Sequence, residues 1–462
     1  MANIERFENL IIGSGGAGKL MAWKLGHDGR QTALVERGAL GGACPNVACL
    51  PSKNLIYSAR VMELARRGAE FGLKTEAMSV DMAAVQHRKR VMVQGLQKMH
   101  LELTVKSGAE LIRGSARFIA PRTVEIDLNG GGKRTVIGER VFLDLGSHAT
   151  MPEVPGLAQA HPMTNVEVLD LDRLPEHLVV IGGGYVGLEL SQAFRRFGAK
   201  VTIIEEGAQI ASHEDADIGA ALKDLFMEEG AEVLVGTKIH QIEGRSGDRI
   251  RIQISDSRGN RTIECSDILI ATGRTANTNG IGLEVTGVQL DEHAFIKVNE
   301  RLLTTAENIW AMGDCAGSPM FTHVSENDFK IVYENLHGGN LTTRGRLIPF
   351  CMFTDPELAR VGMNENEARR AGIEYRLAKM PYAQILRTRT VSEPRGLIKM
   401  LLAKDSDQIL GFTAFGFEAS ELMSAVQTAM VGHLPYTVLR DAIFTHPTMS
   451  EGLNLIAAGV AG

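Results

Sequence analysis

Short apolar runs that end in glycine-rich turns mark two places where a buried strand leads into a helix. The first run is Asn9–Ile12, a helical pattern begins near Lys19, and a second run follows at Thr32–Val35. Leu178–Ile181 and Val201–Ile204 repeat this order later in the chain. Short apolar runs bounded by turn signals are typical of buried parallel strands. The pattern therefore predicts two strand–helix–strand units and an α/β fold.

The end of the chain has a different pattern. Gly396–Leu402 and Ile409–Phe415 are predicted strands, and Ser420–His433 carries apolar residues at helical spacing. Two strands followed by a helix are therefore predicted in this part of the chain.

Composition narrows the class of protein. A chain of 462 residues is too long for one core and indicates about three domains. The net charge of -6 gives no excess of positive charge of the kind that binds nucleic acid or an anionic membrane surface. No long apolar run is present, so no membrane span is expected. The N-terminus lacks the basic start and cleavage region of a signal peptide, so a cytoplasmic location is expected.

The turn after the first strand contains Gly13, Gly15 and Gly18 in a G-x-G-x-x-G arrangement, and Glu36 ends the next strand. Such glycines allow a tight turn and the close approach of a pyrophosphate to a helix N-terminus. The acidic residue can accept a hydrogen bond from a ribose hydroxyl. This unit predicts a dinucleotide site.

The second unit repeats the fingerprint with Gly182, Gly184, Gly187 and Glu205, at the same offset between first glycine and acid. A turn that only joins a strand to a helix needs neither the spacing nor the acid, so two dinucleotide sites are predicted. Glu205 is followed by another glutamate and no nearby arginine. A carboxylate there accepts from a free 2′-hydroxyl and repels a 2′-phosphate, which favours NAD over NADP.

Cys44 and Cys49 lie in the stretch GGACPNVACLPSK, from Gly41 to Lys53. In a regular helix, residues five apart are roughly 8 to 9 Å apart, whereas a disulfide needs less than about 7 Å. A bonded pair therefore requires a broken helix. Pro45 favours an extended conformation at Cys44, and Pro51 removes a backbone donor from the next turn. We interpret the stretch as a redox disulfide at a distorted entry into a helix.

Three other interpretations remain for these cysteines. A zinc knuckle needs a second cysteine pair, and Cys265, Cys315 and Cys351 are too scattered to supply one. Two unbonded core thiols are ordinary in a reducing compartment. A purely structural bridge over so short a loop would stabilise little.

The cysteine stretch begins shortly after Glu36, so an electron carrier bound in the first site would lie against the cysteine pair. A nicotinamide transfers hydride, whereas thiol exchange moves electron pairs through sulfur, so a flavin is needed between them. We therefore predict FAD in the first site and NAD in the second.

Taken in order, these motifs resemble the class I FAD-dependent pyridine nucleotide-disulfide oxidoreductases, which include dihydrolipoamide dehydrogenase and mercuric reductase. The ATGR motif at Ala271–Arg274, MGD at Met312–Asp314 and HPTMSE at His446–Glu451 extend the resemblance over essentially the whole chain. The resemblance implies two Rossmann-like dinucleotide-binding domains and a C-terminal α+β dimerisation domain.

The resemblance also implies roles for individual residues. Cys49 would face the flavin, and Cys44 would exchange with the substrate. Lys53 and Glu189 would pair near the flavin, where a cation stabilises developing negative charge. Tyr185 would cover the flavin until the nicotinamide displaces it.

Further cofactor contacts are implied at Gly146, Gly273, Arg274 and Gly313, with Asp314 binding the ribityl chain of FAD.

At the end of the chain, His446 would be an acid–base residue oriented by Glu451, with Pro447 starting the terminal helix. In the family this histidine enters the partner subunit's site, so a homodimer is expected. Two positions depart from lipoamide dehydrogenases, which usually have glycine where this chain has Ala48 and an A-T-G run where it has Asp144–Gly146.

The predicted domains are an FAD-binding domain at 1–148, an NAD-binding domain at 149–272, a segment at 273–345 that completes the FAD side, and an interface domain at 346–462. The predicted function is dihydrolipoamide dehydrogenase-type electron transfer between NAD(H) and a small disulfide or dithiol. One alternative is a mercuric reductase-like metal-ion or quinone reductase. Another is a bound component of a 2-oxoacid dehydrogenase complex, or a non-catalytic flavoprotein.

Overall fold

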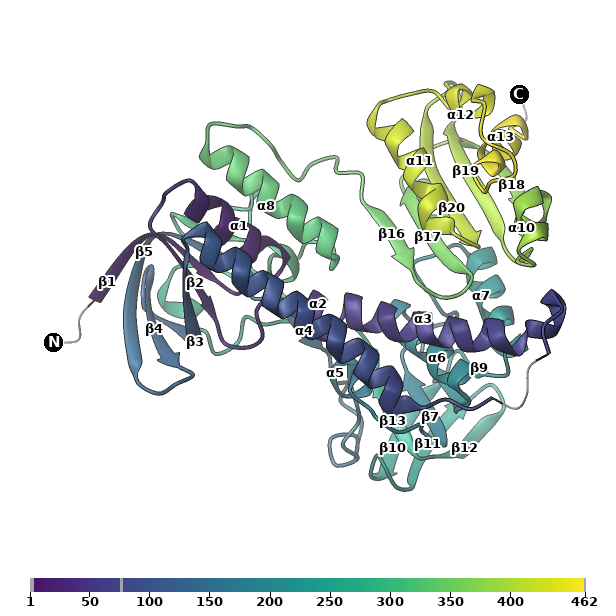
Figure 1. Cartoon of the computed structure of the whole chain (residues 1–462), viewed down its shortest axis with the longest axis horizontal. Helices are drawn as coiled ribbons and strands as arrows, with labels where there is room; N and C mark the ends of the chain where they lie inside the picture. Colours follow the sequence, from purple (N-terminus) through teal and green to yellow (C-terminus); the bar gives the residue numbers. More distant parts are fainter. Residues whose placement is uncertain (1–3, 75–77, 461–462) are drawn as a thin grey trace. The chain divides into compact units, whose positions relative to one another are not determined.

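The computed structural model describes residues 4–74 and 78–460 and divides into two compact units (Figure 1). The first unit comprises the chain up to Asn54, Ala84–Thr150 and Gly273–Arg346. The second comprises Leu55–Ala83, Met151–Thr272 and the chain from Leu347 onward. Both units are therefore assembled from segments far apart in the sequence.

The first unit is built on a six-stranded sheet. Its parallel strands have the order β3-β2-β1-β5-β15, and β4 pairs antiparallel with β3 and β5. A second, two-stranded sheet pairs β6 with β14. The strands are β1 (Ile4–Ile12), β2 (Thr32–Glu36), β3 (Glu110–Ala120), β4 (Thr123–Leu128), β5 (Lys133–Leu143), β6 (Ser147–Ala149), β14 (Arg274–Ala276) and β15 (Ile309–Ala311).

Helices α1 and α8 lie side by side in this unit (Figure 1). Ile11, Leu34 and Phe142 are buried against these helices, and Leu10, Val35 and Val141 are buried in a separate core cluster. Parallel strands covered on both faces are apolar throughout. The helices of this unit are α1 (Gly16–His27), α2 (Ala43–Val47), most of α4 (Met82–Ser107) and α8 (Thr322–Leu336), with short 3₁₀ turns η2 (Leu283–Val285) and η3 (Gly313–Ala316). Helix α3 (Cys49–Arg66) begins in the first unit and continues in the second, which also contains the 3₁₀ turn η1 (Gly68–Phe71).

The second unit contains another parallel sheet, of order β13-β7-β8-β9, and a three-stranded antiparallel sheet, β10-β11-β12. Helix α6 connects β7 to β8, and α7 connects β8 to β9. The elements are α5 (Asn165–Leu169), β7 (His177–Ile181), α6 (Tyr185–Phe197), β8 (Lys200–Ile204), α7 (Ala216–Glu228), β9 (Glu232–Leu234), β10 (Lys238–Gly244), β11 (Ile250–Asp256), β12 (Gly259–Cys265) and β13 (Asp267–Ile270).

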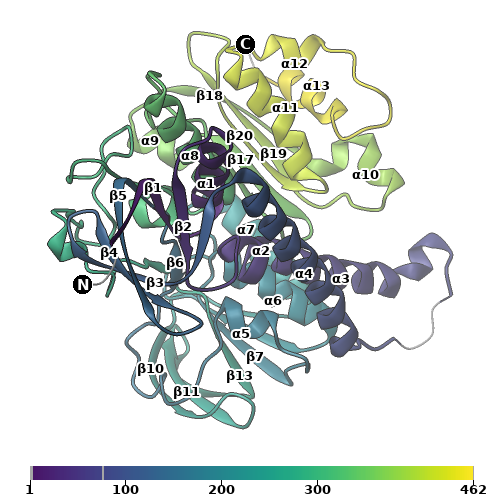
Figure 2. The same ribbon diagram turned by 60° about the vertical axis from the view of Figure 1, so that its left-hand side comes forward.

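The second unit also holds a five-stranded antiparallel sheet of order β16-β17-β20-β19-β18. Helix α11 packs on β17 and β20, and α13 packs on β18 and β19 (Figure 2). The elements are β16 (Pro349–Met352), β17 (Glu357–Gly362), α9 (Glu365–Arg370), β18 (Tyr375–Pro381), η4 (Tyr382–Gln384), α10 (Leu386–Thr390), β19 (Leu397–Ala403), β20 (Ile409–Gly416), α11 (Ala419–Val431), α12 (Thr437–Asp441) and α13 (Glu451–Ala458).

The predicted α/β class is confirmed, with two strand–helix–strand units and a separate antiparallel sheet at the C-terminal end. The predicted start of the terminal helix is wrong. The helix begins at Glu451 and not at Pro447, because the Glu451 carboxylate folds back to accept the Thr448 N–H and holds the preceding residues in a turn. Among the described residues, no helix is long and apolar enough to cross a membrane.

Candidate functional site

The Gly13 turn joins β1 to α1 in a conformation that requires glycine. Gly13 has a φ of 95°, and a Cβ there would lie 2.1 Å from the backbone oxygen of Asp144. A Cβ at Gly18 would lie 2.1 Å from the oxygen of Gly13. Gly15 itself provides no side-chain cap for α1. The Ala17 N–H donates to the Ser325 hydroxyl at 3.0 Å, and the Gly18 N–H donates to Asp144 at 2.7 Å. These features fit the pyrophosphate of FAD.

Glu36, at the end of β2, is fastened to this turn by both carboxylate oxygens. Oε2 accepts hydrogen bonds from the Ser14 N–H at 2.9 Å and the Ser14 hydroxyl at 2.6 Å. Oε1 accepts from the Gly38 N–H at 2.7 Å. The carboxylate is thus held beside the turn, at the place where the fingerprint expects a ribose.

The second fingerprint repeats this construction. Gly182 has a φ of 111°, and a Cβ there would lie 2.3 Å from the Ala271 oxygen. Glu205 accepts from the Gly183 N–H at 2.8 Å and from the Gly207 N–H at 2.7 Å. The repeated hydrogen-bond pattern matches the repeat in the sequence. It fits a second dinucleotide.

The remaining fingerprint glycines differ in how closely their surroundings approach them. A Cβ at Gly187 would lie 2.2 Å from the Gly182 oxygen, so this glycine allows helix α6 to approach the strand. A Cβ at Gly184 or at Gly15 meets different surroundings. Nothing lies within 4 Å at Gly184, whereas the Asp144 carboxylate lies 2.6 Å away at Gly15.

Cys44 and Cys49 come from two different helices. Cys44 lies in α2, Cys49 begins α3, and Ala48 between them has φ -137° and ψ -106°, which breaks the helix. The pKa of Cys44 is raised, first because its thiol shares a hydrogen bond with Cys49 and then because it is partly buried. The Cys49 sulfur also lies 3.5 Å from the Thr322 hydroxyl. The break thus lets the two thiols share a hydrogen bond, and they are not joined by a disulfide in this structure. The redox disulfide stays a prediction.

The prediction for the backbone around Pro45 is wrong in one respect. Cys44 is helical and not extended, because Pro45 sits in the first turn of the short helix α2, where no amide donor is needed. Pro51 takes the equivalent place in the first turn of α3. The distortion is concentrated at Ala48.

Around Asp314, the predicted cofactor residues of the first unit form one polar group. The Ser147 hydroxyl donates to the Asp314 carboxylate, and Arg274 Nε donates to the same hydroxyl at 2.7 Å. Gly146 lies between β5 and β6, and Gly273 between β13 and β14, so both flank the two-stranded sheet that carries Ser147 and Arg274.

Gly313, next to Asp314, is tied to helix α8. Its N–H donates to Asp328 at 2.8 Å, and a Cβ there would lie 2.9 Å from the Ser325 hydroxyl.

Asp144, at the end of β5, is a site residue that the sequence marked only as a departure from A-T-G. Its side chain is buried, and Oδ2 accepts from the Gly18 N–H at 2.7 Å. The pKa of Asp144 is raised to about 7, chiefly by burial and also by the nearby Asp314 and Asp328 carboxylates, whereas the Gly18 N–H and Lys19 act to lower it. A carboxyl group therefore lies directly beneath the first fingerprint.

Tyr185 and Glu189 lie on α6 after the second fingerprint. The Tyr185 hydroxyl donates to Glu214 at 2.9 Å, and the buried Glu189 carboxylate accepts the Phe353 N–H at 2.8 Å. Lys53 is half-buried in α3. Its pairing with Glu189 stays a prediction.

His446 and Glu451 are in contact. The His446 Nδ1 lies 2.9 Å from Glu451 Oε1, and the His446 side chain is 63% exposed. The pKa of Glu451 is lowered, first by the Thr448 N–H and then by His446. Glu451 therefore fixes the ring through one nitrogen and leaves Nε2 for another partner.

Two family matches cover most of the chain. Residues 7–328 match the family described as "Pyridine nucleotide-disulphide oxidoreductase". Residues 348–457 match its dimerisation domain. The chain belongs to this family. Members bind FAD and use NAD(P)H, so the family supplies the two dinucleotides that the two fingerprints fit.

Relatives in the family have different substrates in their names. The chain is 32% identical over 457 residues to the probable pyridine nucleotide-disulfide oxidoreductase RclA of Escherichia coli, covering 98% of each protein. It is 32% identical over 454 residues to a mercuric reductase of Streptomyces lividans, covering 98% of this chain and 95% of the relative. It is 32% identical over 456 residues to a dihydrolipoamide dehydrogenase of Chaetomium thermophilum, covering 96% and 89%.

A solved structure of the Cu(II) complex of RclA, described as an HOCl-induced flavoprotein disulfide reductase, matches with a TM-score of 0.90. Its identity is 31%, and the match covers 98% of this chain and 99% of that one. The protein is therefore a flavoprotein disulfide oxidoreductase of the group that contains dihydrolipoamide dehydrogenase and mercuric reductase.

Proposed function

We propose that this protein transfers electrons between NAD(H) and a small disulfide or dithiol, as dihydrolipoamide dehydrogenases do. The observation that carries the proposal is the pair Cys44 and Cys49, whose thiols share a hydrogen bond across a helix break. FAD, when bound, accepts a hydride and passes an electron pair to sulfur.

The chain's own residues would divide this work. The Gly13 turn and Glu36 would hold FAD, with Asp314 on its ribityl chain. The Gly182 turn and Glu205 would hold NAD in preference to NADP, since the two glycine amides fix the Glu205 carboxylate where it can accept from a ribose hydroxyl. The proposed domains are 1–148 for FAD, 149–272 for NAD, 273–345 completing the FAD side and 346–462 for the interface.

Thiol exchange at Cys44 requires removal of its proton. The pKa of Cys44 is raised, so its thiol needs a base before it can attack or leave as a thiolate. We assign this role to His446 of a second subunit, held by Glu451. The exposed imidazole and the dimerisation-domain match support a homodimer.

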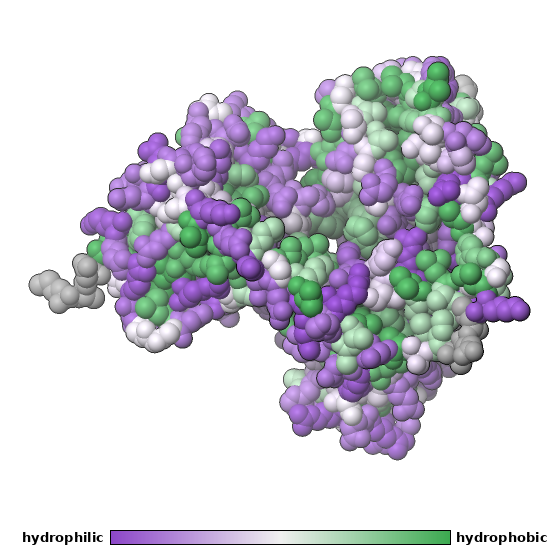
Figure 3. Space-filling view, viewed as in Figure 1, coloured by the Kyte–Doolittle hydropathy of each residue, from purple (hydrophilic) through white to green (hydrophobic). Residues whose placement is uncertain are grey.

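Exposed apolar side chains also support a homodimer. Val431, Leu434, Val438 and Ile443 are exposed on or beside helices α11 and α12, and Figure 3 shows hydrophobic residues on this part of the surface. Clustered exposed apolar residues are typical of protein–protein contacts.

Reduction of a metal ion is a second candidate. One relative is named a mercuric reductase, and RclA was solved as a Cu(II) complex. Two adjacent thiolates are suitable ligands for such soft ions. The same pair could then deliver electrons to a bound ion.

A panel of NADH-dependent turnovers separates the candidates. The acceptors are lipoamide, glutathione disulfide, Hg(II), Cu(II) and a quinone. Turnover highest with lipoamide supports the first proposal, and turnover confined to the ions supports the second. No turnover with any acceptor, together with co-purification with 2-oxoacid dehydrogenase subunits, would favour a non-catalytic component.

Absorbance spectra test the role of the cysteine pair. Anaerobic reduction by two electrons should produce the long-wavelength band of a thiolate beside the flavin. Cys49→Ser should abolish the band, and Cys44→Ser should retain it or show it without reduction. A band that survives unchanged in both variants would refute the assignment.

A further inference from the structure

Tyr185, the predicted cover of the flavin, is held by a partner that no sequence motif indicated. It is the first residue of α6, and its hydroxyl donates to Glu214 Oε1 at 2.9 Å. Burial and the Glu214 carboxylate raise the pKa of Tyr185 well above its usual value, so the hydroxyl keeps its proton and remains a donor. Next to the ring, a Cβ at Gly184 would meet nothing within 4 Å.

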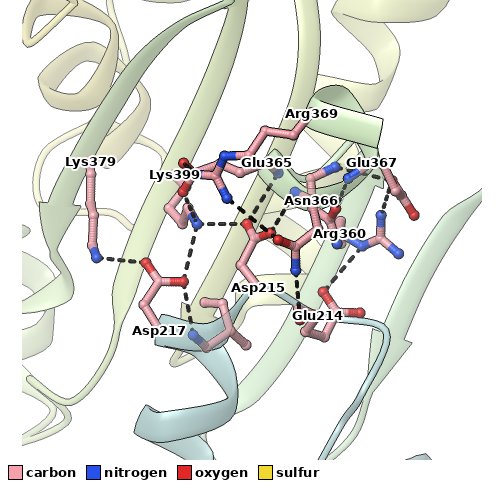
Figure 4. A network of polar contacts seen from close by, with 12 residues as sticks. Glu214, Asp215, Asp217, Arg360, Glu365, Asn366, Glu367, Arg369, Lys379 and Lys399 are labelled. Atoms are coloured by element: carbon pink, nitrogen blue, oxygen red, sulfur yellow. Dashed lines mark hydrogen bonds and ion pairs between the residues drawn. The ribbon is translucent and has the colours of Figure 1, made fainter. Parts of the chain in front are cut away.

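Glu214 is buried and is held in place by Arg360. Only 1% of its side chain is exposed, and Oε2 lies 3.2 Å from Nε of Arg360, which is equally buried. The contact is an ion pair and not a linear hydrogen bond, because the N–H is not aimed at the oxygen. Arg360 also donates to Glu367 at 2.7 Å and lies 4.7 Å from the ring centre of Phe350 (Figure 4).

The loop that carries Glu214 is fixed by its next residue. Asp215 accepts the Asn366 N–H at 2.9 Å and the Glu365 N–H at 3.2 Å, both from the start of α9. The buried Lys399 ammonium lies 2.6 Å from the same carboxylate (Figure 4). The Glu214 carboxylate is therefore unable to follow the tyrosine if the ring swings away.

We propose that Glu214, positioned by Arg360, is a latch that sets how readily the nicotinamide ring displaces Tyr185. The inference rests on the proposed function and on the role that the family resemblance implies for Tyr185, that of covering the flavin. The ring must give up its hydrogen bond to Glu214 before a nicotinamide can take its place. Only molecules in which the ring has moved away can bind the nucleotide. A more stable closed state makes this open fraction smaller, and the apparent affinity for the nucleotide falls in proportion to it. The latch controls nucleotide affinity and leaves the chemistry of the thiols untouched.

Removing the hydroxyl alone tests the latch. Tyr185→Phe keeps the ring and loses the hydrogen bond to a charged group, so the Kd for NAD⁺, measured by calorimetry on the holoenzyme, should fall about tenfold. Glu214→Gln keeps an acceptor without the charge, and the Kd should fall severalfold. The double variant should match Tyr185→Phe, because both changes remove the same bond.

Tyr382→Phe is the matched control. Tyr382 is fully buried in the same unit, and its hydroxyl donates to the Phe417 oxygen at 3.0 Å. This change should lower stability and leave the Kd for NAD⁺ unchanged. In Glu214→Gln, the rate of the dithiol half-reaction should remain near that of the unaltered protein.

An unchanged or higher Kd in Tyr185→Phe would overturn the latch. If the unaltered protein still reduces disulfides with NADH in that case, the proposed function stands without the latch. If the unaltered protein binds neither NADH nor NADPH, the latch and the proposed function fail together. Additive effects in the double variant would also overturn the latch, because they would place the two residues in separate interactions.

Discussion

Asp144 places a titratable group beneath the first glycine turn, so the stability of the protein should depend on its ionisation. An aspartate carboxyl group has an ordinary pKa of 3.8, and burial chiefly raises the pKa of Asp144 to about 7 in the folded protein. Since the folded-state value is higher, the folded protein holds this proton more tightly than the unfolded chain. The contribution to stability is complete below pH 3.8 and is lost as the pH rises through 7.

The size of the effect follows from the difference between the two pKa values. Each pH unit over which only the folded state keeps its proton is worth about 1.4 kcal/mol. Asp144 therefore makes the free energy of unfolding about 4 kcal/mol lower at pH 8 than at pH 3.8, and roughly 2 kcal/mol lower at pH 5. Asp144→Asn keeps an oxygen that can accept the Gly18 N–H and removes the charge.

Urea unfolding of the holoenzyme at several pH values measures this difference. The Asn variant should gain about 2 kcal/mol over the unaltered protein at pH 5 and about 4 kcal/mol at pH 8. Asp127→Asn is the control, since Asp127 is 67% exposed on β4 and a surface ion pair contributes little. A gain that is equal at both pH values, or that shrinks as the pH rises, would refute the reasoning.

Three further predictions concern the ion cluster and the proposed site. Lys399 is fully buried between Asp215, Asp217 and Glu365, so Lys399→Met should lower the free energy of unfolding by about 3–5 kcal/mol. Lys379 is 44% exposed, so Lys379→Met should lower it by less than about 1 kcal/mol. Urea unfolding measures both values. Glu205→Gln should lower kcat/KM for NADH by roughly tenfold to a hundredfold, and an unaltered protein that prefers NADPH would contradict the assignment. His446→Ala should slow the dithiol half-reaction by roughly 10² to 10⁴ while flavin reduction by NADH continues. Subunit exchange with Cys44→Ser should restore part of the activity, and verified heterodimers without recovery would place the histidine outside the partner's site.

The two fingerprints could be predicted because their physics is local. Gly13 and Gly182 need conformations and close contacts that glycine alone permits, and Glu36 and Glu205 reach amides of the adjoining turns. The need for a helix break between the cysteines was predictable from helix geometry. The exact place of the break was not, because prolines in a first turn are compatible with helix and Ala48 carries no visible signal.

The buried charges could not be predicted, because their partners are distant in sequence. Tyr185, Glu214 and Arg360 lie on α6, the β8–α7 loop and β17, and only the fold brings them together. Lysines are rarely fully buried, so the sequence alone gives no reason to expect Lys399 inside the protein. Its burial is possible because three carboxylates from other elements surround its ammonium group. Asp144 was visible as an unusual residue, but its burial depends on the packing of α1 and η3 against β5.

The helix break at Ala48 also places the two sulfurs in different electrostatic surroundings. Cys49 is the first residue of α3, an 18-residue helix whose peptide dipoles align to place partial positive charge at this end. Cys44 belongs to a helix of only five residues and shares its proton with Cys49. Only one of the two sulfurs therefore lies at the positive end of a long helix, where the peptide dipoles favour negative charge. An unbroken helix through both cysteines would have removed this asymmetry, together with the contact between the sulfurs.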